Sequence, residues 1–281
     1  MLYKNLFFDL DDTLWAFSLN ARDTYEEMYW KYGYDRYFDS FEHYYLLYQR
    51  RNLDLWAEYA DGKVTKEELN RQRYLYPLEA VGAGDSTLAK AYERDALTMI
   101  PTKSKLMPHA REVLEYLSGK YNLYILSNGF KELQSHKMRS SGIDEYFKKV
   151  VLSDDIGILK PWPEIFHFAL STTQSELNNS LMIGDSWEND IVGAAGVGMH
   201  QVFYNLSGRT DLPFAPTYQI TDLKDLWKNA GTTERDGRND AKRLCTNVVT
   251  VSDEVKPKKR KMQGKAEYSR RTVCKSLPKK M

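Results

Sequence analysis

Three carboxylates lie within four residues near the start of the chain, at Asp9, Asp11 and Asp12. The short apolar run 6–8 comes directly before them, and a run of this kind predicts a buried strand. Open α/β sheets bind their ligands at the carboxyl ends of their strands, which is where these acids would emerge. Crowded carboxylates repel one another, and a bound cation would relieve that repulsion. The spacing therefore indicates cation-dependent chemistry, with a strand followed by an acidic turn as the structural alternative.

A second apolar run, residues 123–126, ends in Ser127, Asn128 and Gly129. The polar stretch after it is compatible with a helix, so these residues would lie where a strand leads into a helix N-terminus. Backbone amides at such a position form an anion site. The same three residues are also common in ordinary turns.

Two further segments add a lysine and two acids. Lys160 precedes a proline that can occupy the first turn of a helix, and a lysine there is often a solvated surface residue. The apolar run 180–183 predicts another buried strand that leads to Asp185, with Asp190 in the first turn of the next helix. Helix capping is the structural alternative for both acids. All four segments in this order favour a single site.

These segments resemble the four motifs of the haloacid dehalogenase-like (HAD) superfamily, as Asp9-x-Asp11-x-Thr13, Ser127-Asn128, Lys160-Pro161 and Gly184-Asp185…Asp190. The resemblance covers residues 1 to about 227. It implies a nucleophile at Asp9 and a general acid/base at Asp11. It also implies phosphate binding by Ser127 and Lys160, next to an acidic metal-site pair formed by Asp185 and Asp190.

The same residues can be matched to the hydrolysis of a phosphate monoester. Asp9 can attack phosphorus to give an aspartyl-phosphate, and Asp11 can protonate the leaving oxygen. Mg²⁺ suits a site that offers few carboxylates, here Asp9 and Asp185, and the resemblance adds the backbone carbonyl of Asp11. Lys160 would add charge to the phosphoryl oxygens, and Ser127 with the neighbouring amides, including Asn128, would add hydrogen bonds.

The first motif contains two further polar residues, Thr13 and Asp12. Thr13 is expected to orient Asp11 through its hydroxyl, whereas Asp12 receives no role. Displacing halide from carbon needs no proton donor, so the presence of Asp11 favours phosphoryl transfer over dehalogenation. A membrane pump with these motifs would need apolar spans of about 18 residues, and the sequence contains none.

The pattern of elements predicts an α/β fold with a doubly wound, mainly parallel, Rossmann-like sheet. Residues 1–16 and 100–227 would form this catalytic core. Residues 17–99 interrupt it with helices expected at 21–32, 41–59, 66–76 and 87–97. The third of the breaks between them is expected at Pro77 with Gly82 and Gly84. An all-helical insert directly after the first motif resembles the helical cap of one HAD subgroup. Such a cap would close over the site and select the leaving group.

The insert is rich in aromatic residues at spacings of three and four, which predicts a helical core, with one or two rings left to stack on a planar substrate. A second resemblance, to bacterial HAD nucleotidases, rests on Leu53-x-Leu55-Trp56-x-x-Tyr59-x-x-Gly62-x-Val64-Thr65, Asn128-Gly129-Phe130-x-x-Leu133-Gln134 and Gly142-Ile143-x-x-Tyr146-Phe147. It implies hydrolysis of pyrimidine nucleoside monophosphates. Sugar phosphatases are similar enough to stay open as an alternative.

The composition fits a cytoplasmic enzyme that is a monomer or dimer. The 281 residues are 42% hydrophobic, and the two cysteines offer neither a disulfide framework nor a zinc site. Residues 228–281 differ, since they hold 16 Lys or Arg against six Asp or Glu, whereas the other 227 residues hold 24 and 33. This basic tail is expected to be disordered, with nucleic-acid binding as the alternative.

The sequence therefore predicts a Mg²⁺-dependent phosphomonoesterase that acts on a small phosphorylated substrate, with a nucleoside 5′-monophosphate as the expected one. A sugar-phosphate phosphatase or a phosphomutase on the same core is the alternative within this class. From another class, the alternative is a catalytically idle protein that binds RNA through its tail. Acids at every motif position argue against an idle core.

Overall fold

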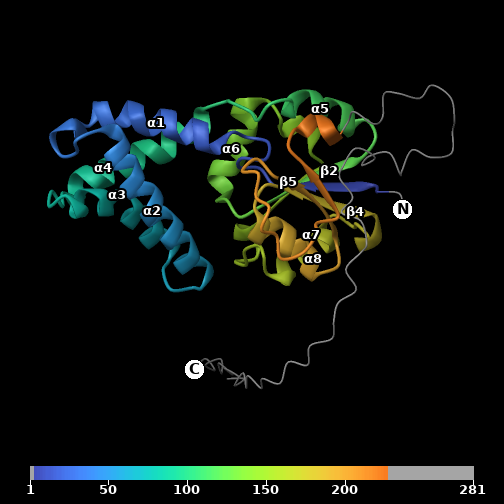
Figure 1. The fold of residues 1–281 in the computed structure, drawn as a ribbon. Coiled ribbons are helices and arrows are strands. Elements are labelled where there is room, and N and C mark those ends of the chain that lie inside the picture. The colour runs from blue at the N-terminus through green and yellow to red at the C-terminus, as the bar shows by residue number, and fades with distance from the viewer. Residues whose placement is uncertain (1–2, 227–281) are drawn as a thin grey trace, which may run out of the picture. The chain divides into compact units, whose positions relative to one another are not determined.

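A parallel six-stranded sheet forms the centre of the computed structural model, which describes residues 3–226 (Figure 1). The strand order is β3-β2-β1-β4-β5-β6, and every neighbouring pair is parallel. The strands are β1 Asn5–Phe8, β2 Asn122–Ser127, β3 Lys149–Leu152, β4 Ser180–Gly184, β5 His200–Tyr204 and β6 Tyr218–Ile220. The predicted parallel sheet is confirmed.

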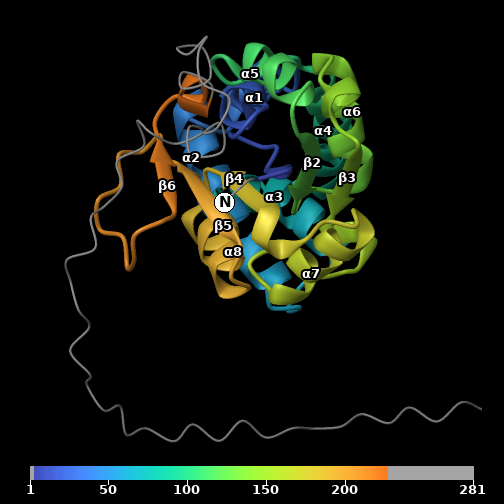
Figure 2. The same ribbon diagram turned by 90° about the vertical axis from the view of Figure 1, so that its right-hand side faces the viewer.

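Alternate residues of β1 point to opposite faces of the sheet, and helices cover both faces (Figure 2). Phe8 packs in the cluster that includes α5 (Ala110–Ser118) and α6 (Lys131–Ser141). Phe7 packs in a second cluster with α7 (Pro163–Thr172) and α8 (Gly193–Gly196). A strand buried on both faces reads as a continuous apolar run, which is why residues 6–8 show no alternation.

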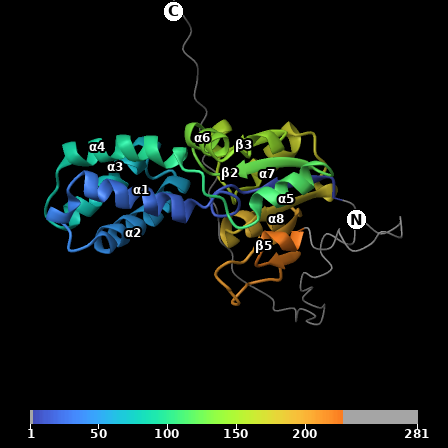
Figure 3. The same cartoon turned by 90° about the horizontal axis from the view of Figure 1, so that it is seen from above.

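Four helices fill the segment between β1 and the core helix α5, and they lie together as one bundle (Figure 3). They are α1 Phe17–Lys31, α2 Phe41–Ala60, α3 Lys66–Ala80 and α4 Ser86–Met99. The predicted helices correspond to these four, with ends that differ by a few residues. This bundle is called the cap below. Shorter helical turns occupy Tyr34–Arg36, Ile100–Thr102, Asp144–Tyr146, Ser153–Asp155, Leu177–Asn179 and Leu223–Leu226, and a π-helix occupies Trp187–Val192.

Tyrosines form much of the interior of the cap. Tyr25, Tyr44, Tyr74 and Tyr92 are almost completely buried, and their rings contact one another. A buried hydroxyl needs a hydrogen-bond partner, and the Tyr25 hydroxyl has one in that of Tyr48, at 2.6 Å. Most of the periodic aromatic residues therefore pack as the helical core that their spacing predicts.

The third predicted break holds at Gly82 and Gly84, which lie between α3 and α4, but it is wrong at Pro77, because α3 continues through this residue to Ala80. A proline removes one backbone hydrogen bond, and here it does so in the last turn of the helix, where few such bonds follow. Burial of Leu75, Pro77 and Leu78 holds that turn against its neighbours. The helix ends instead before Gly82, which adopts a left-handed φ of 73°.

The basic tail at residues 228–281 lies outside the described residues, as does the end of the predicted core at residue 227. Two expectations stay predictions. One is the division into a core domain at 1–16 and 100–227 and a cap domain at 17–99, and the other is the cytoplasmic location. Within residues 3–226, none of the helices combines the length and the apolar character that crossing a membrane requires.

Candidate active site

The predicted site residues meet at the carboxyl ends of three neighbouring strands. Phe8 of β1 lies opposite Ile125 of β2 and Ile183 of β4. The next residue along the first strand is Asp9, whose backbone N–H donates to the Ile183 carbonyl at 2.9 Å. Because the strands are parallel and in register, residues that follow them in sequence emerge at one edge of the sheet. Segments more than 100 residues apart are thereby brought together.

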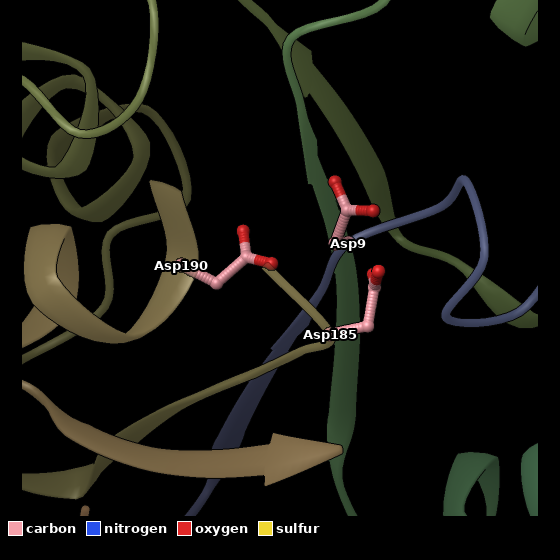
Figure 4. A group of neighbouring side chains, drawn as sticks. All are labelled: Asp9, Asp185 and Asp190. Carbon is pink, nitrogen blue, oxygen red and sulfur yellow. The ribbon is translucent and has the colours of Figure 1, made fainter. Parts of the chain in front are cut away.

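Three carboxylates form the centre of this edge (Figure 4). One oxygen from each of Asp9, Asp185 and Asp190 lies within 4.8 Å of the others. Burial raises the pKa of Asp9, and the nearby charges of Asp190 and Asp185 add to this effect, while Lys160 opposes it. Burial, followed by repulsion from Asp190, raises the pKa of Asp185 to about 7. The cluster therefore holds more negative charge than its surroundings favour, which is a reason to bind a cation.

Lys160 links two of these acids. Its Nζ donates to Asp9 Oδ1 and to Asp190 Oδ1, each at 2.6 Å, and to the Leu126 carbonyl at 2.8 Å. Only 2% of the Lys160 side chain is exposed. A buried ammonium with three acceptors is fixed in one orientation, so its charge is held next to the oxygen of Asp9.

Asn128 holds the backbone of Lys160 instead of facing a ligand with its side chain. Its Oδ1 accepts from the Lys160 N–H at 2.7 Å, and its Nδ2 donates to the Lys160 carbonyl at 2.9 Å. The predicted role of Asn128 was phosphate binding, and the structure uses both polar atoms of this side chain for positioning. The loop after β2 is thereby joined to the lysine that precedes α7.

Asp190 also has both carboxylate oxygens engaged. Oδ1 accepts from Lys160, and Oδ2 accepts from the backbone N–H of Ser186 at 3.0 Å. The side chain is completely buried. Asp190 therefore positions the lysine and the loop after β4, whereas the resemblance implied a metal-site pair of Asp185 and Asp190.

Thr13 contacts a different acid from the one expected. Its Oγ1 donates to Asp185 Oδ1 at 2.7 Å and accepts from the Asp185 backbone N–H at 3.1 Å. The expectation that Thr13 orients Asp11 is corrected accordingly. The chain turns sharply after β1, with the N–H groups of Leu14 and Trp15 both donating to the Leu10 carbonyl. This turn directs Thr13 towards the loop after β4.

Asp11 is held by two residues of α6. Lys137 Nζ donates to both carboxylate oxygens, at 2.7 and 2.9 Å, and Gln134 Nε2 donates to Oδ2 at 2.9 Å. The same Gln134 Nε2 donates to Ser127 Oγ at 2.8 Å. The Ser127 hydroxyl accepts this bond and keeps its own proton available for a ligand. Gln134 thus connects the first and second motifs.

Lys137 was not among the site residues predicted from the sequence, although its spacing from Gln134 could have indicated it. Gln134 and Lys137 are three residues apart on a helix, so they lie on one face of it. Lys137 is 3% exposed, and its ammonium lies 4.7 Å from the centre of the Trp15 ring and 5.1 Å from that of Phe17. These aromatic faces stabilise the cation next to Asp11.

Asp12, which received no role, holds the start of the cap. Its two carboxylate oxygens accept from the backbone N–H and the hydroxyl of Ser18, at 2.8 and 2.6 Å. Ser18 lies in the first turn of α1, where backbone N–H groups lack helical partners. The third acid of the first motif therefore links the loop after β1 to the cap.

A cavity of about 940 Å³ lies over the strand ends. Asp9, Asp11, Ser127 and Lys160 line it from the sheet side. The cap contributes aromatic and polar side chains, among them Tyr48, Trp56, Asn52 and Arg73. The volume lies in the range of cavities that enclose small organic ligands, and the lining is mainly apolar with a few polar groups.

Comparisons with known proteins give the family. A family model described as haloacid dehalogenase-like hydrolase matches residues 3–198. The chain is 29% identical to pyrimidine 5′-nucleotidase YjjG of Escherichia coli (strain K12), over 80% of this chain and 97% of the relative. It is 28% identical to pyrimidine 5′-nucleotidase PynA of Streptococcus pneumoniae (strain ATCC BAA-255 / R6), over 80% and 94%.

A solved structure supports the same conclusion. The putative HAD-hydrolase YfnB of Bacillus subtilis, solved bound to magnesium, matches with a TM-score of 0.72 and 26% identity, over 81% of this chain and 98% of that chain. The family model spans more than half of the chain, and the motifs meet at one site as the family requires. The protein belongs to the haloacid dehalogenase-like hydrolase family.

Proposed function

We propose that the protein is a Mg²⁺-dependent phosphomonoester hydrolase that acts on nucleoside 5′-monophosphates through an aspartyl-phosphate. One observation carries the proposal. A buried carboxylate, Asp9, lies between a fixed lysine and a second carboxylate at the base of a ligand-sized cavity, with Asp11 lining the same cavity. This is the set of groups that nucleophilic phosphoryl transfer needs.

The donor set fits a hard divalent cation. Lys160 occupies Asp9 Oδ1 and Thr13 occupies Asp185 Oδ1, which leaves the second oxygen of each carboxylate for a metal. Asp9 and Asp185 would hold Mg²⁺, and the family adds the backbone carbonyl of Asp11. When bound, Mg²⁺ neutralises phosphate charge so that an anionic nucleophile can approach.

The chain's own residues supply the two chemical steps. An oxygen of Asp9 attacks phosphorus and forms the aspartyl-phosphate, and the bond from phosphorus to the ester oxygen breaks. Asp11 gives a proton to the departing alkoxide. Asp11 then takes a proton from the water that attacks the aspartyl-phosphate, which releases phosphate and restores Asp9. Lys137 and Gln134 keep the carboxylate of Asp11 in one orientation through both steps.

Phosphate contacts come from the second and third motifs. Lys160 places a positive charge next to the attacking oxygen and the phosphoryl group. Ser127 accepts from Gln134 and so directs its own O–H into the cavity that both residues line. The side chains of Ser127 and Lys160 are almost completely buried. Charge-assisted hydrogen bonds are strong where water is excluded.

Two features support a nucleotide as substrate. The cavity is large enough for a base and a sugar in addition to phosphate, and aromatic side chains of the cap line it. The names of the relatives YjjG and PynA include pyrimidine 5′-nucleotidase activity, which favours the same substrate class.

The test is phosphate release from a panel of nucleoside monophosphates and sugar phosphates, with and without Mg²⁺. We expect turnover that depends on Mg²⁺, a preference for nucleotides, and loss of activity in Asp9→Asn. The control is Asp54→Asn, which makes the same change at an exposed position on α2. Equal activity of Asp9→Asn and the wild type would refute the nucleophile, and a preference for sugar phosphates would refute the substrate class.

A further inference from the structure

Arg73 is a buried cation of the cap that lines the cavity, and Glu93 is an acidic neighbour whose charge acts on it without a salt bridge. Arg73 lies on α3, lines the cavity and is 7% exposed. Its Nη2 donates to Asn70 Oδ1 at 2.5 Å, while its buried Nε has no hydrogen-bond partner. Among residues 3–226, Arg73 forms no salt bridge. A buried N–H without an acceptor is costly, so the Nε–H of Arg73 calls for a ligand group that accepts a hydrogen bond.

The surroundings of Arg73 keep it charged. Burial lowers the pKa of its guanidinium, but arginine stays protonated in proteins, and the nearby charge of Glu93 raises the pKa. The guanidinium also lies 5.1 Å from the centre of the Tyr74 ring, where the aromatic face attracts a cation. Tyr48 and Tyr25 line the cavity next to it. Arg73 therefore offers a charged donor on an aromatic wall.

A second unpaired atom lines the same cavity. Asn52 of α2 has a buried Oδ1 with no hydrogen-bond partner. The cap thus contributes one unsatisfied donor, Arg73 Nε–H, and one unsatisfied acceptor, Asn52 Oδ1. A third unpaired atom, Gln134 Oε1, lines the cavity from the core. Buried polar groups are nearly always paired, so the two unpaired atoms of the cap point to a ligand that carries the complementary pair.

A nucleobase carries that pair on one edge. In uracil and thymine a keto oxygen, which accepts a hydrogen bond, lies next to a ring N–H, which donates one. Tyr45, Tyr48 and Trp56, all on α2, line the cavity and supply aromatic surface for the planar ring. A sugar offers hydroxyl groups but no flat face.

We propose that Arg73 and Asn52 form the base-binding subsite of this enzyme, in which Arg73 donates to a keto oxygen of the nucleobase and Asn52 accepts from the adjacent N–H. The inference rests on the proposed nucleotidase function and names the residues that select its leaving group. The phosphate is bound at the strand ends, so these two cap residues act on specificity. They do not take part in the chemical steps.

The test compares kcat/KM for uridine 5′-monophosphate with that for ribose 5-phosphate, which lacks the base. We expect Arg73→Met to lower the ratio of the two values by roughly 10- to 150-fold, the range for a hydrogen bond from a charged donor. Asn52→Leu should lower it about 2- to 10-fold, as for a neutral bond. The matched control is Arg71→Met, because Arg71 is an exposed arginine on the same helix.

The outcomes separate the two proposals. A wild type that prefers ribose 5-phosphate refutes the nucleotidase function itself. A wild type that prefers the nucleotide, together with an unchanged ratio in both variants, overturns the base-binding subsite alone. A loss that falls on phosphoserine, whose leaving group carries a carboxylate, and spares the nucleotide also overturns it. If circular dichroism shows that Arg73→Met is unfolded, Asn52→Leu decides.

Discussion

Replacing Thr13 with valine should weaken the binding of Mg²⁺ to the enzyme without removing any proposed metal ligand. Valine has the shape of threonine but no hydroxyl, and the Thr13 side chain is completely buried. The change therefore leaves Asp185 Oδ1 without its donor at 2.7 Å and the Asp185 N–H without its acceptor. The carboxylate loses the contacts that hold it in place at the end of β4.

The size of the effect follows from these bonds. A hydrogen bond to a charged group contributes about 1.5–3 kcal/mol, which corresponds to a factor of roughly 10 to 150 in an equilibrium constant. The Thr13 hydroxyl also lowers the pKa of Asp185 against the burial that raises it to about 7. Without the hydroxyl the pKa rises further, so protons compete better with the metal at neutral pH. The lost hydrogen bond and the raised pKa of Asp185 both weaken Mg²⁺ binding.

The assay is the Mg²⁺ concentration that gives half of the maximal rate at pH 7.5. We expect Thr13→Val to raise this concentration at least 10-fold, while excess Mg²⁺ restores most of the turnover. Thr24→Val is the matched control, since Thr24 is also fully buried but donates to the Asn20 carbonyl within α1. An unchanged Mg²⁺ requirement in a folded Thr13→Val variant would refute the role of Thr13 at the metal site.

Two other predictions concern the site acids. The pKa of Asp185 is raised from 3.8 to about 7 on folding, so its contribution to stability is present below pH 4 and lost as the pH rises through 7. The metal-free protein should therefore lose on the order of 2–4 kcal/mol of unfolding free energy between pH 4.5 and 7.5, and Mg²⁺ should restore it. Urea denaturation in EDTA measures this, and a flat profile would contradict it. Lys137→Met should misplace Asp11 and lower kcat for a nucleotide at least 10-fold, with a much smaller loss for an activated aryl phosphate, because a good leaving group needs less protonation. Equal losses for the two substrates would contradict the role of Lys137.

The sequence was sufficient to predict the sheet and the place of the site. Apolar runs that end in Asp9, Ser127 and Asp185 define strands whose carboxyl ends must meet in a parallel sheet. Hydrophobic periodicity and the order of the elements carry this information locally. Strand register then converts it into proximity in space.

The individual contacts could not be predicted in this way. Whether Thr13 binds Asp11 or Asp185 depends on how the loop after β1 turns, and no local pattern encodes that turn. The hold of Lys137 on Asp11 joins residues 126 positions apart and depends on the placement of α6 on the sheet. The continuation of α3 through Pro77 depends on tertiary packing, which outweighs local propensity.

The most direct test of covalent phosphoryl transfer is to trap the phosphorylated enzyme. The wild type is mixed with Mg²⁺ and a nucleoside monophosphate, quenched in acid within milliseconds, digested and examined by mass spectrometry. We expect the added mass of one phosphoryl group on Asp9, and its absence from Asp9→Asn. A phosphoryl group found on Asp11, or hydrolysis at full rate with no acid-stable adduct on any aspartate, would contradict the proposed mechanism.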